Sequence, residues 1–218
     1  MLKRPVFNES KFTSTARVYA ENNVSIRCTE FYNRIFVGFA SYMGAGVIRG
    51  NVSIGRYCSI GKDVKIGLAD HPLTNFTTHP LYTGKVIVDD NVSNILSNCK
   101  VMQFPEVQLS LVIGDDVWIG DDVLIKKGIK IGQGAVIGAN SVVTKDIPPY
   151  SVVVGSPARI LKYRFTDKII EDLIESEWYK IAPSDLSSIS PSNTVESFIE
   201  KISDFDRGFL PCFVQYQS

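Results

Sequence analysis

The sequence predicts an all-β solenoid, built as a parallel β-helix with a protruding loop and C-terminal helices. The first observation is an Ile or Val at every sixth position from Ile113 to Val143. The second is an earlier run with the same step, between residues 36 and 66. The third is the break between the runs, because Ile66 and Ile113 lie 47 positions apart, which is not a multiple of six.

Both runs have a period that neither an α-helix nor a simple strand produces. Each six-residue unit forms a short strand and a tight turn, three units close a triangular coil, and successive coils stack as parallel strands. No unit can bury its apolar side alone, so each coil depends on its neighbours. A β-sandwich with coincidental spacing is the alternative, and six unslipped steps disfavour it. The residues predicted to point inward are Phe36, Tyr42, Ile48, Ile54, Ile60 and Ile66 in the first run, and Ile113, Ile119, Ile125, Ile131, Ile137 and Val143 in the second.

The runs define two predicted domains. Residues 1–162 form the β-helix domain, with a loop excursion at about 67–112, and residues 163–218 form a C-terminal helical extension. Residues 1–30 are less regular, and they either start the first coil or cap it.

The C-terminal extension shows helical spacing in TDKIIEDLIESEWY, where Thr166 is the candidate N-cap. The stretch VESFIEKISDF predicts a second short helix. The first helix is expected to pack against the β-helix, because terminal repeats need a cap.

Composition excludes several classes of protein. The chain has 23 basic and 23 acidic side chains, which argues against a nucleic-acid-binding protein. No run of about 18 apolar residues is present, so we expect no membrane span. The N-terminal segment MLKRPVFNES lacks the apolar stretch of a signal peptide. The four cysteines, with no CxxC pair, fit a reducing cytoplasm.

The break between the runs contains both histidines of the chain, His71 and His79, with Asp70 beside the first. A long excursion from a rigid repeat is where function tends to lie. The histidines could be metal ligands, hydrogen-bonded loop residues without chemistry, or a general base. The metal-site interpretation is disfavoured because no further ligands follow the two histidines at a recognisable spacing. The position at the end of a repeat block favours catalysis, for which a largely neutral imidazole is suited.

Several motifs together resemble the left-handed β-helix acyltransferases. They are the hexads, DHP and TTHP in the loop, VWIG at 117–120 and VVTKDIPPYSVVVGSPARILKYRF at 142–165. The similarity is greatest to the branch of xenobiotic acetyltransferases, which modify chloramphenicol and streptogramins, and of related sugar O-acetyltransferases. It covers roughly residues 30–180, and the combined motifs are more specific than the hexads alone.

This resemblance implies a homotrimer in which acetyl-CoA lies in a cleft between two subunits and no metal is required. His71 in DHP matches the family's catalytic histidine, which takes the proton of an acceptor hydroxyl as its oxygen attacks the thioester. His79 in TTHP is a candidate acceptor-binding residue.

The resemblance also implies a path for the donor. Trp118 matches a position near the CoA arm, and its alternative role is packing at a subunit contact. Positions along the pantetheine and nucleotide path correspond to Asp121, Ala139, Thr144 and Lys145. Cations near the CoA phosphates correspond to Arg159 and Lys162, whose alternative is a solvated surface.

The expected function is acetyl-CoA-dependent O-acetylation of a hydroxyl on a sugar or a surface-polysaccharide precursor. Detoxification of a chloramphenicol- or streptogramin-type antibiotic is the alternative within the same chemistry. A non-catalytic β-helix scaffold is the alternative of another class. The segment SEWYKIAP departs from the paired tryptophans of the xenobiotic branch, which leaves the acceptor class open. A γ-class carbonic anhydrase would need more metal-binding histidines than the two present.

Overall fold

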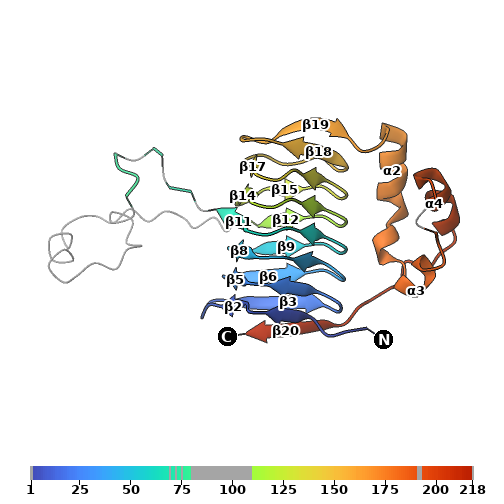
Figure 1. Ribbon diagram of the computed structural model, residues 1–218, viewed down its shortest axis with the longest axis horizontal. Coiled ribbons are helices and arrows are strands. Elements are labelled where there is room, and N and C mark those ends of the chain that lie inside the picture. Colours follow the sequence, from blue (N-terminus) through green and yellow to red (C-terminus); the bar gives the residue numbers. More distant parts are fainter. Residues whose placement is uncertain are drawn as a thin grey trace. The chain divides into compact units, whose positions relative to one another are not determined.

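Three sheets form the three faces of a left-handed parallel β-helix, as the sequence predicts (Figure 1). The computed structural model describes residues 2–68, 70–71, 73–74, 76–79, 110–190 and 193–217. Face A contains, in spatial order, β1 (Val6–Asn8), β4 (Ser25–Arg27), β7 (Tyr42–Met43), β10 (Ser59–Ile60), β13 (Trp118–Ile119), β16 (Val136–Ile137), β18 (Ser151–Val154) and β19 (Arg159–Tyr163). Face B contains β2 (Lys11–Phe12), β5 (Thr29–Phe31), β8 (Gly46–Ile48), β11 (Val64–Leu68), β14 (Leu124–Lys126) and β17 (Val142–Val143). Face C contains β20 (Phe213–Gln217), β3 (Arg17–Glu21), β6 (Arg34–Val37), β9 (Val52–Ile54), β12 (Leu111–Ile113) and β15 (Lys130–Ile131).

The second ladder lies inside the β-helix as predicted. Its residues stack from coil to coil in register, so that Ile119 pairs with Ile137. Ile119 also pairs with Ile60 of the first ladder. All six ladder residues of this run are at most 2% exposed: Ile113, Ile119, Ile125, Ile131, Ile137 and Val143. Each buried aliphatic side chain of this size contributes roughly 1.5–3 kcal/mol.

The first ladder is predicted correctly only from Ile48 onward. Phe36 is 39% exposed and Tyr42 is 52% exposed, and the inward residues are their neighbours Val37 and Met43. The reason is a turn that is one residue shorter, since Met43 precedes Ile48 by five positions instead of six. A shift by one residue in a strand moves every side chain to the opposite face.

The turns explain the polar residues between the ladder positions. Asp63, Asp122 and Asn140 occupy the same place in successive turns and have left-handed φ angles of 55°, 57° and 58°. Asp and Asn are the non-glycine residues that tolerate this conformation best. The glycine after the ladder residue has another role, because a Cβ on Gly120 would lie 2.6 Å from the backbone nitrogen of Ala139 in the next coil.

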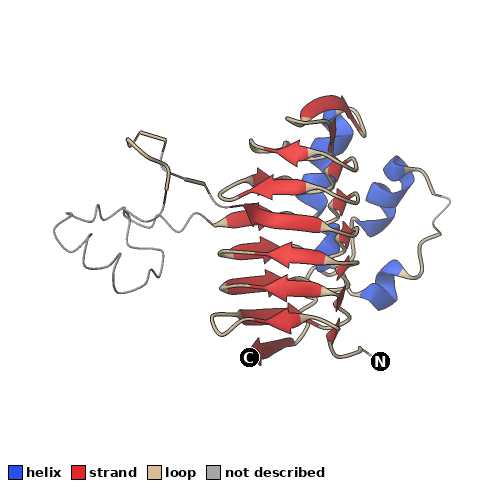
Figure 2. Ribbon diagram, turned by 60° about the vertical axis from the view of Figure 1, so that its left-hand side comes forward, coloured by secondary structure: helices blue, strands red, loops and turns tan. Residues whose placement is uncertain are grey.

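Three short helices and one 3₁₀ turn follow the β-helix and cover one edge of it (Figure 2). They are α2 (Asp167–Ser176), η2 (Trp178–Lys180), α3 (Pro183–Leu186) and α4 (Val195–Ile202). Each edge of the β-helix takes the names of the two faces that meet at it. The helices lie on the C–A edge, where Trp178 packs against Tyr57. Thr166 is the N-cap residue of α2, as expected, but its side chain makes no capping hydrogen bond. No helix in the described part of the chain is long and apolar enough to cross a lipid bilayer.

A buried ion pair fastens the C-terminal segment to the β-helix. The Arg56 guanidinium donates to both carboxylate oxygens of Glu21, at 2.8 and 2.9 Å, and the two side chains are 14% and 6% exposed. The same guanidinium donates to the backbone oxygens of Tyr179 (3.2 Å) and Phe209 (3.3 Å). Since a bidentate Arg–carboxylate pair has fixed geometry, Arg56 holds the chain at Tyr179 and at Phe209 against the β-helix.

The last strand was not predicted from the sequence. β20 pairs antiparallel with β3, so the chain end returns to the first coil after the helices (Figure 1). Residues 1–30 start the coil, because β1 to β4 are in register with the strands that follow.

The loop excursion begins and ends on the B–C edge. The chain leaves the β-helix after β11 on face B and returns at β12 on face C. Residues 69–108 form a separate unit, which is described below by itself.

The inward ladder generates the first prediction. Ile125→Ala should lower the free energy of unfolding by about 2–5 kcal/mol, because it leaves a cavity between three coils. Lys65→Ala, an outward position on the neighbouring strand, is the matched control and should change it by about 0.5 kcal/mol or less. Urea denaturation followed by circular dichroism measures both values. Equal losses in the two variants would contradict an inward Ile125.

Candidate active site

The His71 ring is oriented by a hydrogen bond within its own loop. Its Nδ1 atom lies 2.8 Å from the backbone oxygen of Thr78. A carbonyl oxygen can only accept a hydrogen bond, so Nδ1 carries the hydrogen. In the neutral ring, Nε2 then has the free lone pair and can accept a proton. The ring is exposed, as a base that meets a substrate must be.

His79 lies in the same described part of the loop. Its backbone N–H donates to the hydroxyl oxygen of Thr77, at 3.2 Å, and its side chain is exposed. Two apolar side chains of this segment, Leu73 and Phe76, are 86% and 83% exposed. The loop therefore presents two imidazoles and two large apolar groups on its surface.

Trp118 and Lys162, predicted at opposite ends of the donor path, lie in one column of face A. Trp118 pairs with Val136, Val136 with Val152, and Val152 with Lys162. Adjacent strands are about 4.8 Å apart, so the two residues are separated by roughly 14 Å. Trp118 is 57% exposed. Arg159 begins β19, the last strand of the same face, and is also exposed.

The remaining predicted residues lie on two different edges. Asp121 and Ala139 are in successive turns of the A–B edge, between β13 and β14 and between β16 and β17. Thr144 and Lys145 follow β17 on the B–C edge, the edge from which the histidine loop departs. Face B separates the two pairs, so the structure of one chain brings Trp118, Asp121 and Ala139 into proximity but not Thr144 and Lys145.

Asp121 has a structural contact that sequence reasoning missed. Its Oδ1 accepts a hydrogen bond of 2.7 Å from the backbone N–H of Lys62, in the coil below. A Cβ on Gly61 would lie 2.2 Å from that oxygen, so the glycine makes room for the contact. Asp115 accepts from the N–H of Arg56 in the same way. The repeated GDD sequence at 114–116 and 120–122 is the signal that could have revealed these contacts.

Burial shifts the pKa values of acidic groups at the C–A edge. It raises the pKa of Asp115, and it raises that of Asp116, for which the neighbouring Arg164 partly offsets the effect. Burial also raises the pKa of the Cys58 thiol to about 12. A thiol of that pKa is protonated near neutral pH, so Cys58 is a core residue and not a nucleophile.

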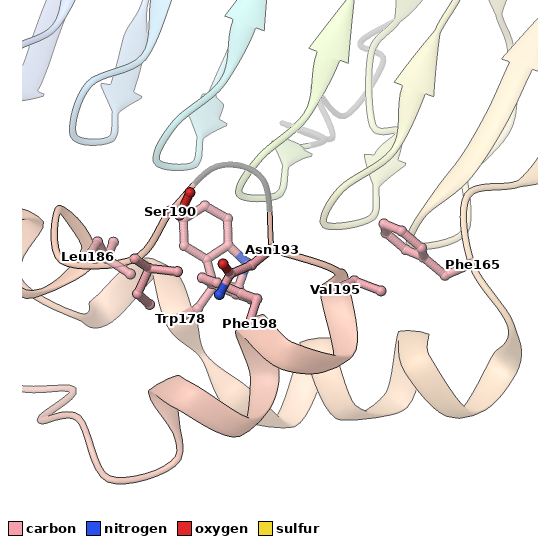
Figure 3. Close-up of a pocket in the computed structure, with 8 residues that line it drawn as sticks. Phe165, Trp178, Leu186, Ser190, Asn193, Val195 and Phe198 are labelled. Carbon is pink, nitrogen blue, oxygen red and sulfur yellow. The ribbon is translucent and has the colours of Figure 1, made fainter.

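One described cavity lies among the C-terminal helices. It has a volume of about 500 Å³, and Figure 3 shows Trp178 and Phe198 side by side in its wall. The lining contains no carboxylate, imidazole or thiol, and none of the residues predicted for the site: Phe165, Trp178, Leu186, Ile189, Ser190, Asn193, Val195 and Phe198. It is an apolar space between helices and offers no acyl-transfer chemistry.

Comparison with known proteins decides the family. Residues 110–145 match the profile described as bacterial transferase hexapeptide (six repeats). A probable macrolide acetyltransferase of Lysinibacillus sphaericus is 34% identical over 151 residues, which cover 68% of this chain and 80% of that protein. The chain belongs to the hexapeptide-repeat transferase family. It is therefore an acyltransferase, and the alternative of a non-catalytic scaffold is wrong.

Two further acetyltransferases are similar to this chain, one over a shorter part of its sequence and one in a crystal structure. A chloramphenicol acetyltransferase of Klebsiella aerogenes is 50% identical over 80 residues, covering 37% of this chain and 38% of that protein. The crystal structure of a maltose O-acetyltransferase from Clostridium difficile is 28% identical, with a TM-score of 0.38 and coverage of 76% of this chain and 72% of that one. A likeness of that TM-score carries no argument about activity.

The contact of Asp121 generates the second prediction. Asp121→Ala should lower the free energy of unfolding by about 1 kcal/mol, because the N–H of Lys62 loses its acceptor. Asp121→Asn retains an oxygen acceptor, so its free energy of unfolding should fall by less. Thermal unfolding and calorimetric titration with CoA are measured for both variants. If Asp121 contacts the donor directly, the Asn variant will bind CoA more weakly while keeping its stability. Unchanged CoA binding would show that Asp121 has a structural role only.

Proposed function

We propose that this transferase uses acetyl-CoA to acetylate a hydroxyl of a sugar or a surface-polysaccharide precursor, with His71 as the general base. The observation that carries the proposal is the hydrogen bond from Nδ1 of His71 to the Thr78 oxygen. It leaves Nε2 able to accept a proton, on an exposed loop of a chain whose family transfers acyl groups. The proposed reaction needs no metal ion, because the imidazole itself takes up the proton.

The proposed reaction proceeds in two steps. Nε2 of His71 removes the proton of the acceptor hydroxyl while the hydroxyl oxygen forms a bond to the thioester carbonyl carbon. The negative charge on the carbonyl oxygen is stabilised by hydrogen-bond donors. Collapse of this intermediate breaks the C–S bond, and the leaving thiolate of CoA takes the proton from the imidazolium. The products are the acetyl ester and free CoA, and His71 returns to its neutral form.

The donor path of the proposal follows face A. The exposed ring of Trp118 would pack against the pantetheine arm, and the small Ala139 would let that arm approach the backbone. Arg159 and Lys162, both exposed on β19, would bind the phosphates through charge-assisted hydrogen bonds. Asp121, Thr144 and Lys145 complete the proposed path.

A homotrimer is part of the proposal. The predicted donor-binding residues form two groups. One group lies on face A and the A–B edge, and the other, Thr144 and Lys145, lies on the B–C edge. One donor molecule reaches both groups if they belong to different subunits that meet at a cleft. The exposed Leu73 and Phe76 of the histidine loop favour the same arrangement, because burial against a neighbour would remove large apolar surfaces from water.

Acetylation of an antibiotic is the second candidate. It is favoured by the relatives, of which one is named a probable macrolide acetyltransferase and others chloramphenicol acetyltransferases. Both candidates use the same proton transfer and differ only in the molecule that carries the hydroxyl.

The role of His71 generates the third prediction. His71→Ala should bind CoA normally and lose at least about 10²-fold in kcat, since positioned base catalysis contributes 10²–10⁴-fold. His79→Ala is the matched control, with a higher KM for the acceptor and a smaller change in kcat. The assay follows free thiol released from acetyl-CoA with a panel of sugars, chloramphenicol and macrolides. Near-normal turnover by His71→Ala would remove this residue from the mechanism.

The oligomeric state generates the fourth prediction. Light scattering coupled to size exclusion should give three times the chain mass of 24.2 kDa. Mixed oligomers of His71→Ala and Trp118→Ala chains should recover part of the activity that each variant lacks, because some clefts receive an intact residue from each side. A monomeric mass, or no recovery on mixing, would contradict a site shared between subunits.

A further inference from the structure

Face C has an open depression beside the edge where the histidine loop returns. It has a volume of about 360 Å³ and is lined by Arg34, Phe36, Asn51, Val52, Ser53, Ser110 and Leu111. None of these residues is assigned to the donor path or to the base.

The register of the strands explains why the surface is hollow there. Phe36, Ser53 and Val112 form one outward column across β6, β9 and β12. Arg34 begins β6, and Asn51 and Ser110 directly precede β9 and β12, so these three residues continue the register as the column beside it. Small side chains in the middle coil lie between the larger Phe36 below and Val112 above. With strands about 4.8 Å apart and 3.3 Å per residue, the patch measures roughly 10 by 7 Å, the size of one or two sugar rings.

The walls of the depression are of the kind that bind carbohydrate. Phe36 is 39% exposed, and its ring stacks on Tyr19 with a centroid distance of 4.9 Å and an interplanar angle of 15°. This fixed aromatic surface offers an apolar face to the C–H groups of a sugar ring. Ser53 and Ser110 supply hydroxyl groups beside it, which is the combination of apolar wall and few polar groups seen in ligand sites.

The charge beside the depression is positive. Arg34 is exposed, and no carboxylate in the described part of the chain pairs with it. In the turns of the B–C edge and the strand residues next to them, the described acids are Asp70 and Asp146, and the described cations are Arg17, Arg34, Arg49, Lys126, Lys127, Lys130 and Lys145. The A–B edge, counted in the same way, has the opposite balance, with Lys11, Arg27 and Lys62 against Glu9, Asp63, Asp121 and Asp122. Among the described residues, the B–C edge thus carries a surplus of positive charge in a chain of zero net charge.

We propose that the depression of Arg34, Phe36 and Ser53 binds an anionic sugar unit of the acceptor, one that carries a carboxylate or a phosphate. The proposal rests on the proposed function, because it specifies the acceptor of that same transfer. Arg34 donates to the anionic group, and Phe36 packs against the ring of the sugar. The hydroxyl to be acetylated belongs to the same glycan.

The test is binding of the labelled full chain to an array of matched neutral and anionic glycans. Wild-type protein should bind the carboxylated or phosphorylated members and not their neutral counterparts. Arg34→Gln should weaken this binding at least about tenfold, because it removes a charge-assisted bond. Ser53→Phe fills the depression from an outward position and should weaken it similarly. Lys62→Gln, an exposed lysine of the A–B edge, is the matched control and should bind as the wild type does.

Three results would overturn the proposal: no glycan binding, equal binding of neutral and anionic glycans, or unchanged binding by Arg34→Gln and Ser53→Phe. Calorimetric titration with CoA separates the acceptor from the donor phosphates. Arg34→Gln should bind CoA with wild-type affinity, and a loss of CoA binding alone would assign the cation to the donor. Glycan binding requires neither His71 nor CoA. Binding of anionic glycans without acetyl transfer to any sugar would therefore refute the proposed function and keep this subsite, whereas acetyl transfer to a neutral sugar without binding of anionic glycans would do the reverse.

Discussion

The stacking of one coil on the next through parallel hydrogen bonds, with an aliphatic residue inside each strand, is the constraint on which the structure depends. The N–H of Gly61 donates to the oxygen of Ile119 at 2.9 Å, and that of Gly120 to the oxygen of Ile137 at 2.8 Å. These bonds fix the register of all outward side chains. The column from Trp118 to Lys162 and the depression around Phe36 are both consequences of this register.

The same constraint allows a long excursion without loss of the fold. Ile48 pairs with Ile66 before the break and Ile54 with Ile113 after it, so the coil resumes in register. The entropic cost of closing a loop rises only slowly with the length of the loop. The coils on each side hold its two ends. A rigid frame with one insertion is therefore a physically simple way to carry a histidine outside a solenoid.

The sequence predicts the parts of this structure that follow from a strict local period. All six residues of the second ladder are buried, whereas Phe36 and Tyr42 are outward because a single turn is one residue shorter. β20 escaped prediction because its partner β3 lies almost the whole chain away. The anchor of His71 is a backbone oxygen, which any residue at position 78 would supply, so no side-chain pattern could reveal it. The placement of site residues on separate edges likewise follows from the register and not from their spacing.

The tautomer of the His71 ring tests the central claim most directly. The chain has two histidines, so His79→Gln leaves a single imidazole to observe by two-bond ¹H–¹⁵N NMR. In free histidine the hydrogen of the neutral ring prefers Nε2. A loop that presents Nε2 as the base should reverse this preference, with hydrogen on Nδ1 and a lone pair on Nε2. Hydrogen on Nε2 in the neutral ring would contradict the account.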